Sequence, residues 1–176
     1  VTPHIRREAV PLKPVIAHEA IHYIEIPDYE ALNRKFDDFC ARVGEDYLKA
    51  NGIRKPRYMT ALPELIRRKG LEAKMPDYVK GSEFFKKLAI KRYLEQLRHS
   101  RLCGFEMLQF ADTLKYENKN GIVDCFDDDK YIDPEWMRSV NADAILLARF
   151  ENEVFYHDTP VNVVLSISNF LPQPYI

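Results

Sequence analysis

The residues best placed to do chemistry lie at the end of an apolar segment near the start of the chain. Residues 14–22 read Pro-Val-Ile-Ala-His-Glu-Ala-Ile-His, so the carboxylate of Glu19 follows an apolar run and is flanked by His18 and His22. β-branched residues favour extended backbone, and continuous apolarity is typical of a strand buried on both faces. Ionisable groups at the carboxyl end of a barrel strand lie where catalysis occurs. Glu19 is therefore the first candidate catalytic residue, although the same pattern also suits a strand that simply leaves a core.

A second segment shares this organisation. Residues 104–112 read Gly-Phe-Glu-Met-Leu-Gln-Phe-Ala-Asp, and after the polar segment 116–121 the chain continues as Gly121-Ile-Val-Asp124. Together the two segments resemble the last two strands of the catalytic barrel of glycoside hydrolase family 2, which contains the β-galactosidases and β-glucuronidases. The resemblance extends over about residues 14–170, and its specific parts are the two strand motifs.

The resemblance implies a role for each of four residues. Glu19 matches the nucleophile at the end of the seventh barrel strand, and His22 matches a histidine three residues further on. His18 or His22 would orient the nucleophile or bind a sugar hydroxyl, with simple packing as the alternative. Asp112, at the end of the eighth strand, is a candidate for a sugar contact or for a structural bond to a neighbouring loop. Retaining glycosidases use two carboxyl groups, one as nucleophile and one as general acid.

The sequence also departs from the family pattern. Leu108 occupies the place of a tryptophan that lines the sugar pocket in family enzymes. Asn118 and Asn120 fall where glucuronidases carry Asn-x-Lys, so the lysine is missing and glucuronate specificity is not supported. A different sugar is one explanation. The other is a non-catalytic carbohydrate-binding or structural and assembly module derived from the same barrel.

Chain length limits how much of a barrel is present. A complete (β/α)₈ barrel takes about 250 residues, whereas this chain has 176. The resemblance therefore implies an α/β fold in which residues 1–143 form the C-terminal part of a TIM barrel and residues 144–176 begin a β-sandwich domain. We expect the general acid to lie outside the chain, which alone would be inactive. The rest of a parent chain, or an oligomer, would cover the barrel edges.

Composition limits the partners and cofactors. The net charge is −1, so no general attraction to nucleic acid is expected, and no membrane partner is predicted. The family resemblance implies that the partner is a carbohydrate. The cysteines Cys40, Cys103 and Cys125 are an odd number without CxxC spacing, and free thiols are expected. The acidic run 124–133 lacks the glycine and terminal glutamate of an EF-hand loop, so neither a metal nor a cofactor is predicted. If the parent is a bacterial polysaccharide degrader, the resemblance implies a periplasmic or extracellular location.

Helices are predicted between the two motifs. Asp28 can cap a helix that ends near Gly44, and a shorter helix follows to Asn51. Prolines and glycines divide residues 53–81 into short helices. Ser82 is expected to cap a longer helix with an apolar stripe on one face and lysines opposite. The stripe consists of Phe84, Phe85, Leu88, Tyr93, Leu94 and Leu97, and the lysines include Lys86.

The remaining elements follow the second motif. Residues 104–111 are predicted to form a strand. Asp133 before Pro134 is a helix start, because aspartate caps and proline suits the first helical position. The pattern then changes to β, with strands expected over 144–150, 154–156 and 161–170.

Overall fold

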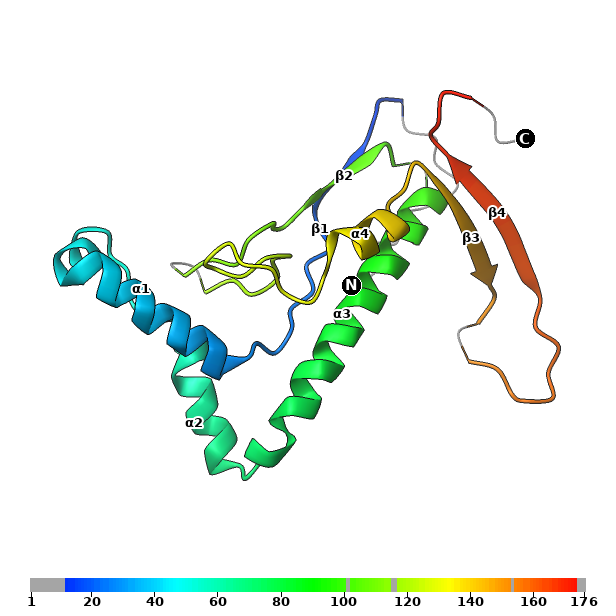
Figure 1. The fold of residues 1–176 in the computed structure, drawn as a ribbon. Helices are drawn as coiled ribbons and strands as arrows, with labels where there is room; N and C mark the ends of the chain where they lie inside the picture. The colour runs from blue at the N-terminus through cyan, green and yellow to red at the C-terminus, as the bar shows by residue number, and fades with distance from the viewer. Residues whose placement is uncertain (1–11, 101, 115–116, 153, 174–176) are drawn as a thin grey trace.

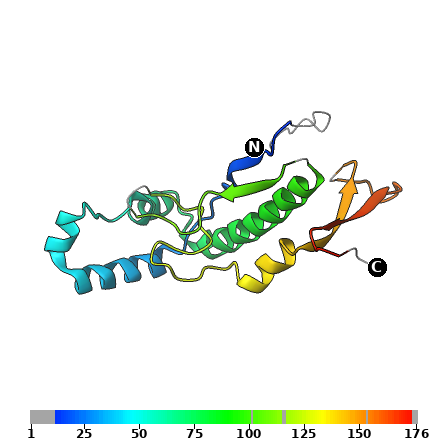
Figure 2. The same cartoon turned by 90° about the horizontal axis from the view of Figure 1, so that it is seen from above.

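The protein is described by a computed structural model that covers residues 12–100, 102–114, 117–152 and 154–173. Within these residues the fold is mixed α/β (Figure 1). The helix α3 forms the centre, the helices α1 and α2 form one end of the molecule and a β-hairpin forms the other (Figures 1 and 2). The elements are β1 (Ile16–Ala20), α1 (Tyr29–Ala50), the 3₁₀ turn η1 (Arg57–Met59), α2 (Ala61–Arg68), the 3₁₀ turn η2 (Glu72–Lys74), α3 (Met75–His99), β2 (Gly104–Met107), α4 (Pro134–Val140), β3 (Ala144–Phe150) and β4 (Val163–Asn169).

The long helix α3 carries the main core. Its buried residues recur at intervals of three and four, which places them on one face; they are Lys86, Ala89, Ile90, Tyr93, Leu94 and Leu97. The predicted stripe is therefore wrong in part, because Phe84 and Phe85 are exposed and Lys86 is fully buried. The predicted start is also wrong. The helix begins at Met75, with a proline in its first turn, and Ser82 lies inside it, where its hydroxyl accepts a hydrogen bond from the Ile26 N–H at 2.8 Å.

The helix α1 follows the predicted pattern closely. The Asp28 side chain accepts a hydrogen bond from the Ala31 N–H at 3.0 Å, which satisfies a free donor of the first turn. Gly44 has φ 79°, outside the helical region, so the helix is interrupted there and resumes to Ala50. The expected pair of helices around Gly44 is thereby confirmed. The buried side of α1 packs in a second apolar cluster, formed by Tyr29, Leu32, Phe36, Tyr58 and Met59.

The strands β1 and β2 form a two-stranded parallel sheet, as expected for consecutive strands joined by a helical crossover. The second strand is shorter than the predicted range 104–111. It ends at Met107, and Ala111 makes only an isolated bridge. One face of the sheet packs against α3 and α4 through Ala17, Ala20 and Phe105. In the described part of the chain no element covers the other face, where Ile16 is 57% exposed.

The antiparallel hairpin β3–β4 completes the structure. The strands predicted over 144–150 and 161–170 are confirmed within a few residues, whereas the strand predicted over 154–156 is wrong, because these residues lie in the connection between β3 and β4. Arg98 attaches the hairpin to α3. Its guanidinium donates to the Ala142 carbonyl at 2.6 Å and to the Ser168 hydroxyl at 3.2 Å.

Neither a closed barrel nor a sandwich of two packed sheets is formed by the described residues. The division at residue 143 and the barrel and sandwich assignments therefore remain predictions. Residue 116 of the expected polar loop lies outside the described residues. No helix in the described ranges is both long enough and apolar enough to span a bilayer.

Candidate functional site

The carboxyl ends of β1 and β2 lie at the same edge of the parallel sheet. The Leu108 N–H, just beyond β2, donates to the Ala20 carbonyl at the end of β1 at 3.1 Å. The loop after β1 runs through Glu25 to Asp28, and the long loop after β2 runs through Asp112 to Asp133. The two loops meet at this edge, which is where ligands bind in parallel α/β folds.

Glu19 lies in a register shift at the end of β1. Ala17 pairs with Phe105 and Ala20 pairs with Met107, so three steps along β1 face two steps along β2. The extra residue lets Ala17 and Ala20 both face α3, while His18 and Glu19 are both exposed. Glu19 has φ 51°, which is uncommon for a residue other than glycine. Such shifts redirect side chains next to active sites, and here the redirected side chain is the predicted nucleophile.

The two predicted histidines are also exposed. The Nε2 atom of His18 lies 3.7 Å from Oε2 of Glu106 on β2, and the two side chains are 76% and 66% exposed. The structure therefore places a second carboxylate, which the sequence motif did not single out, on the same uncovered face as His18. His22 lies beyond the end of β1 and is exposed to solvent.

Asp112 belongs to a different part of the site. It is buried, and both of its carboxylate oxygens are engaged within the protein. Oδ1 accepts from the Gly121 N–H at 2.7 Å, and Oδ2 lies 2.7 Å from Nζ of Lys130. Of the two roles open to Asp112, these contacts favour the structural bond to a neighbouring loop.

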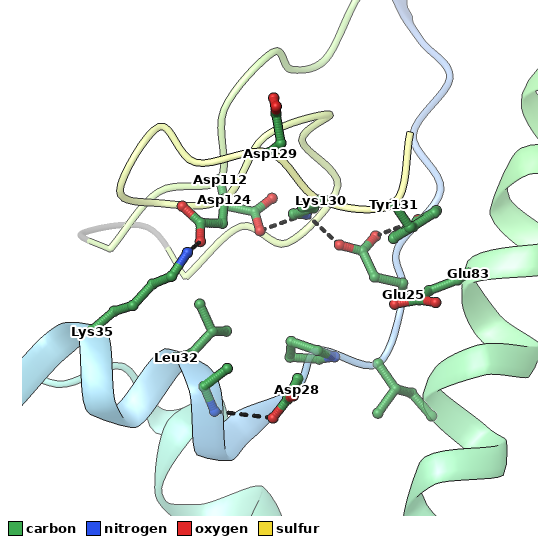
Figure 3. A pocket seen from close by; sticks show the side chains of 13 residues that line it. Glu25, Asp28, Leu32, Lys35, Glu83, Asp112, Asp124, Asp129, Lys130 and Tyr131 are labelled. Atoms are coloured by element: carbon green, nitrogen blue, oxygen red, sulfur yellow. Dashed lines mark hydrogen bonds and ion pairs between the residues drawn. The ribbon is translucent and has the colours of Figure 1, made fainter. Parts of the chain in front are cut away.

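Behind this edge, buried charges join the two loops to α3. Nζ of Lys86 donates to Oε2 of Glu25 at 2.6 Å and to the Gly121 carbonyl at 2.8 Å. Lys130 lies between Glu25 and Asp112 and contacts both carboxylates, as Figure 3 shows. The Tyr131 hydroxyl donates to Oε2 of Glu25 at 3.3 Å. We call Glu25, Lys86, Asp112, Gly121, Lys130 and Tyr131 the ionic cluster.

Burial dominates the electrostatics of the ionic cluster. Desolvation lowers the pKa of Lys86 and raises the pKa of Asp112, because loss of water penalises each charged form. The negative charge of Glu25 acts in the opposite direction and raises the pKa of Lys86. The positive charge of Lys130 likewise lowers the pKa of Asp112. Desolvation also raises the pKa of Tyr131, with Glu25 adding to the shift. A phenol that keeps its proton remains a hydrogen-bond donor to Glu25.

A cavity of about 300 Å³ lies between the ionic cluster and α1. Its far wall includes Lys35, whose Nζ lies 2.5 Å from Oδ2 of Asp124 and 2.7 Å from Oδ2 of Asp128. Oδ1 of Asp124 accepts from the N–H groups of Phe126 and Asp128. Figure 3 shows Lys35 paired with Asp124 at this wall of the cavity, and Lys130 paired with Glu25 and Asp112 at the other. Within the described residues, no group of three or more His, Cys, Asp and Glu side chains is placed to hold a metal ion.

The ionic cluster was not predicted from the sequence, yet part of it left a signal. Lys86 occupies a position on the apolar face of α3, four residues before Ile90. A lysine on such a face must find a buried acceptor, so its spacing predicts a buried ion pair. The partner, Glu25, stands in an irregular loop and carries no comparable periodic signal.

Comparison with known proteins leaves the family open. No protein-family model matches this chain, and no curated protein matches it significantly. The resemblance to glycoside hydrolase family 2 thus depends on the two strand motifs.

The cysteines allow a test of the structure around Asp124. Burial raises the pKa of Cys125 to about 11, and its Sγ lies 4.0 Å from the Tyr58 hydroxyl, whereas Cys103 is exposed. Because the thiolate is the reactive form, we expect iodoacetamide at pH 8 to modify Cys103 at least about tenfold faster than Cys125. Timed alkylation with peptide mass spectrometry measures both rates. The difference should vanish in denaturant, and equal rates in the native protein would contradict the described environment.

Proposed function

We propose that this chain supplies the nucleophile side of a retaining glycosidase that hydrolyses O-glycosidic bonds of an oligosaccharide or polysaccharide. Glu19 is the proposed nucleophile. A segment outside these residues would supply the general acid, and the chain alone would then be inactive. His18 and His22 are proposed to orient Glu19 or to bind sugar hydroxyls.

The position of Glu19 is the observation that carries this proposal. Its carboxylate is exposed at the carboxyl edge of a parallel strand pair, in a register shift that turns it away from α3. A nucleophile of a retaining glycosidase must be ionised and must reach the anomeric carbon. Glu19 is exposed to solvent, and among the described residues no hydrogen bond or ion pair holds its carboxylate, so it is accessible to a substrate. Asp112, in contrast, has both oxygens engaged.

The uncovered sheet face supports the wider architecture that we propose. Parallel sheets are usually covered on both faces, yet Ile16 and the His18–Glu106 pair are exposed opposite α3. The hairpin also exposes apolar side chains, among them Leu146 and Leu165. Further strands of a barrel, and further strands of a sandwich, would cover these surfaces. A carbohydrate would then bind at the carboxyl edge.

Covalent labelling tests the nucleophile directly. The longest natural protein that contains this chain is incubated with a panel of 2-deoxy-2-fluoroglycosyl inactivators, and labelled peptides are mapped by mass spectrometry. We expect one sugar configuration to label Glu19, and Glu19→Gln to abolish the label. Glu135→Gln is the control, because Glu135 is an exposed carboxylate on α4 and should leave Glu19 reactive.

The same experiment addresses the non-catalytic alternative. Label on another carboxylate would contradict the role of Glu19. If no inactivator in the panel labels the protein while it still binds sugar, the protein is a carbohydrate-binding module that has kept the barrel strands without the reaction.

A further inference from the structure

We infer that the outward face of the β3–β4 hairpin is a dimer interface, which packs against the same face of a second copy of this chain. In an antiparallel sheet, directly paired residues point to the same face, and alternate residues of one strand share that face. The pairing therefore places six apolar side chains together, Leu146 with Ile167, Ala148 with Leu165, and Phe150 with Val163. We call these six residues the hairpin face.

The hairpin face is open to solvent in the described part of the chain. Leu146, Leu165 and Ile167 are 65%, 63% and 59% exposed, and the other three residues are exposed as well. The opposite face meets the helix, since Leu147 is buried there and the Arg98 guanidinium of α3 donates to a serine hydroxyl of β4. Figures 1 and 2 show the hairpin at one end of the molecule, beyond α3 and α4. Contiguous apolar surface of this kind is typical of an interaction site.

The hairpin face is large enough for a dimer. From the exposed fractions, covering it would remove roughly 600 Å² of accessible surface from each copy and about 1,200 Å² in total, the lower end of the range for stable protein interfaces. Burial of apolar surface drives association. Because the area is at the lower end of that range, we expect two copies to associate weakly and reversibly.

The chemistry of the hairpin face selects a second copy as the partner. In a two-fold dimer the same patch lies on both sides of the interface, so a charge near the symmetry axis meets a like charge. All six residues of the hairpin face have hydrocarbon side chains. The face can therefore meet itself without charge repulsion and without leaving a polar side chain unpaired. The whole chain has a net charge of −1, so little electrostatic repulsion separates two copies.

Two hairpin faces can pack as the layers of a sandwich. Packed sheets lie about 10 Å apart, with their strand directions within about 30° of each other, and their inner side chains interdigitate. Two hairpins in this arrangement form four strands in two layers. The second layer of the sandwich predicted from the sequence would then come from another molecule of the same protein.

Sedimentation velocity of the complete chain tests the inference. We expect the mass of one copy, 20.7 kDa, at about 5 μM and twice that mass at about 500 μM, as for a dissociation constant of tens of micromolar. In a concentrated mixture of ¹³C-labelled and unlabelled protein, isotope-filtered NOEs should connect the methyl groups of Leu146, Leu165 and Ile167 between copies. The mass of one copy throughout the series would overturn the inference.

Charged substitutions locate the interface. Leu165→Glu and Ile167→Glu each place a carboxylate on the hairpin face, where dimerisation would remove its water, so each should weaken association at least about tenfold. Both positions are exposed in one copy, and circular dichroism checks the fold. A folding defect in one variant leaves the other as the test.

Val164→Glu is the matched control. Val164 is the neighbouring residue of the same strand, is exposed, and faces the other side of the hairpin. This variant should dimerise as the original chain does. A dimer of unchanged affinity in both hairpin-face variants, or equal weakening in the control, would overturn the inference.

The dimer is independent of the proposed reaction. Glu19 belongs to the other sheet, so Glu19→Gln should leave the dissociation constant unchanged. If Glu19 is labelled and the chain remains a single copy at every concentration, the dimer falls and the proposed function stands. If no inactivator labels Glu19 while Leu165→Glu separates the copies, the proposed function falls and the dimer stands.

Discussion

Replacing Lys86 by methionine is expected to lower the free energy of unfolding by about 3–5 kcal/mol. The side chain is fully buried, and its Nζ contacts both the Glu25 carboxylate and the Gly121 carbonyl. Methionine preserves the apolar part of the side chain but leaves Glu25 with less compensation for its burial. Removing one partner of a buried pair is costly because the remaining charge lacks both water and its counterion. Urea denaturation followed by circular dichroism gives the change.

Two further variants separate the ion pair from general effects on the helix. Lys80→Met removes an exposed lysine from the same helix and should change the stability by less than about 0.5 kcal/mol. The double variant Lys86→Met, Glu25→Gln should lose less stability than the sum of its two single variants, because Glu25 then carries no buried charge for Lys86 to compensate. Additive effects would show that Lys86 and Glu25 are not coupled, contrary to the described contact.

Replacing Gly121 by alanine is expected to lower the free energy of unfolding by about 3 kcal/mol, at the upper end of the usual cost of overpacking. A Cβ at this position would lie 2.5 Å from the Asp112 nitrogen and 2.6 Å from the Ala111 carbonyl carbon. These are backbone atoms, which cannot rotate away as the end of a side chain can. The shift would also disturb the Gly121 N–H bond to Asp112 and the carbonyl that Lys86 and Lys130 contact.

A second glycine provides the matched comparison. Gly81 lies within α3, and a Cβ there would have nothing within 4 Å. Gly81→Ala should therefore raise the stability by about 0.5–1 kcal/mol, because alanine favours the helix. Thermal unfolding measures the change in stability of both variants. A Gly121→Ala protein as stable as the original would show that Gly121 does not approach Ala111 and Asp112 as described.

Local signals in the sequence predicted individual elements well. Asp28 and Asp133 both cap helices as expected, since each carboxylate accepts from an N–H three residues later. Gly44 interrupts its helix for the reason that glycine usually does, a positive φ. These features depend on a few neighbouring residues and need no knowledge of the rest of the fold.

Features that depend on distant residues were harder to predict. Ser82 has the residue type of a helix cap, but its hydroxyl instead receives the Ile26 N–H from a loop far away in the sequence. Phe84 and Phe85 have the residue type of core positions, yet both are exposed. The buried face of α3 contains Ile90 and Leu94, and Lys86 lies on that same face. Likewise, the buried partners of Asp112 became apparent only when the loops were placed together.

The register shift in β1 allows two neighbouring residues to face solvent while the residues on either side of them pack in the core. In a regular strand, alternate side chains are committed to packing, so only every second position is open to change. Here Ala17 and Ala20 keep contact with the core while the two consecutive residues between them are free of it. Natural variation at positions 18 and 19 can therefore alter what the strand presents to a ligand without altering the packing on which folding depends.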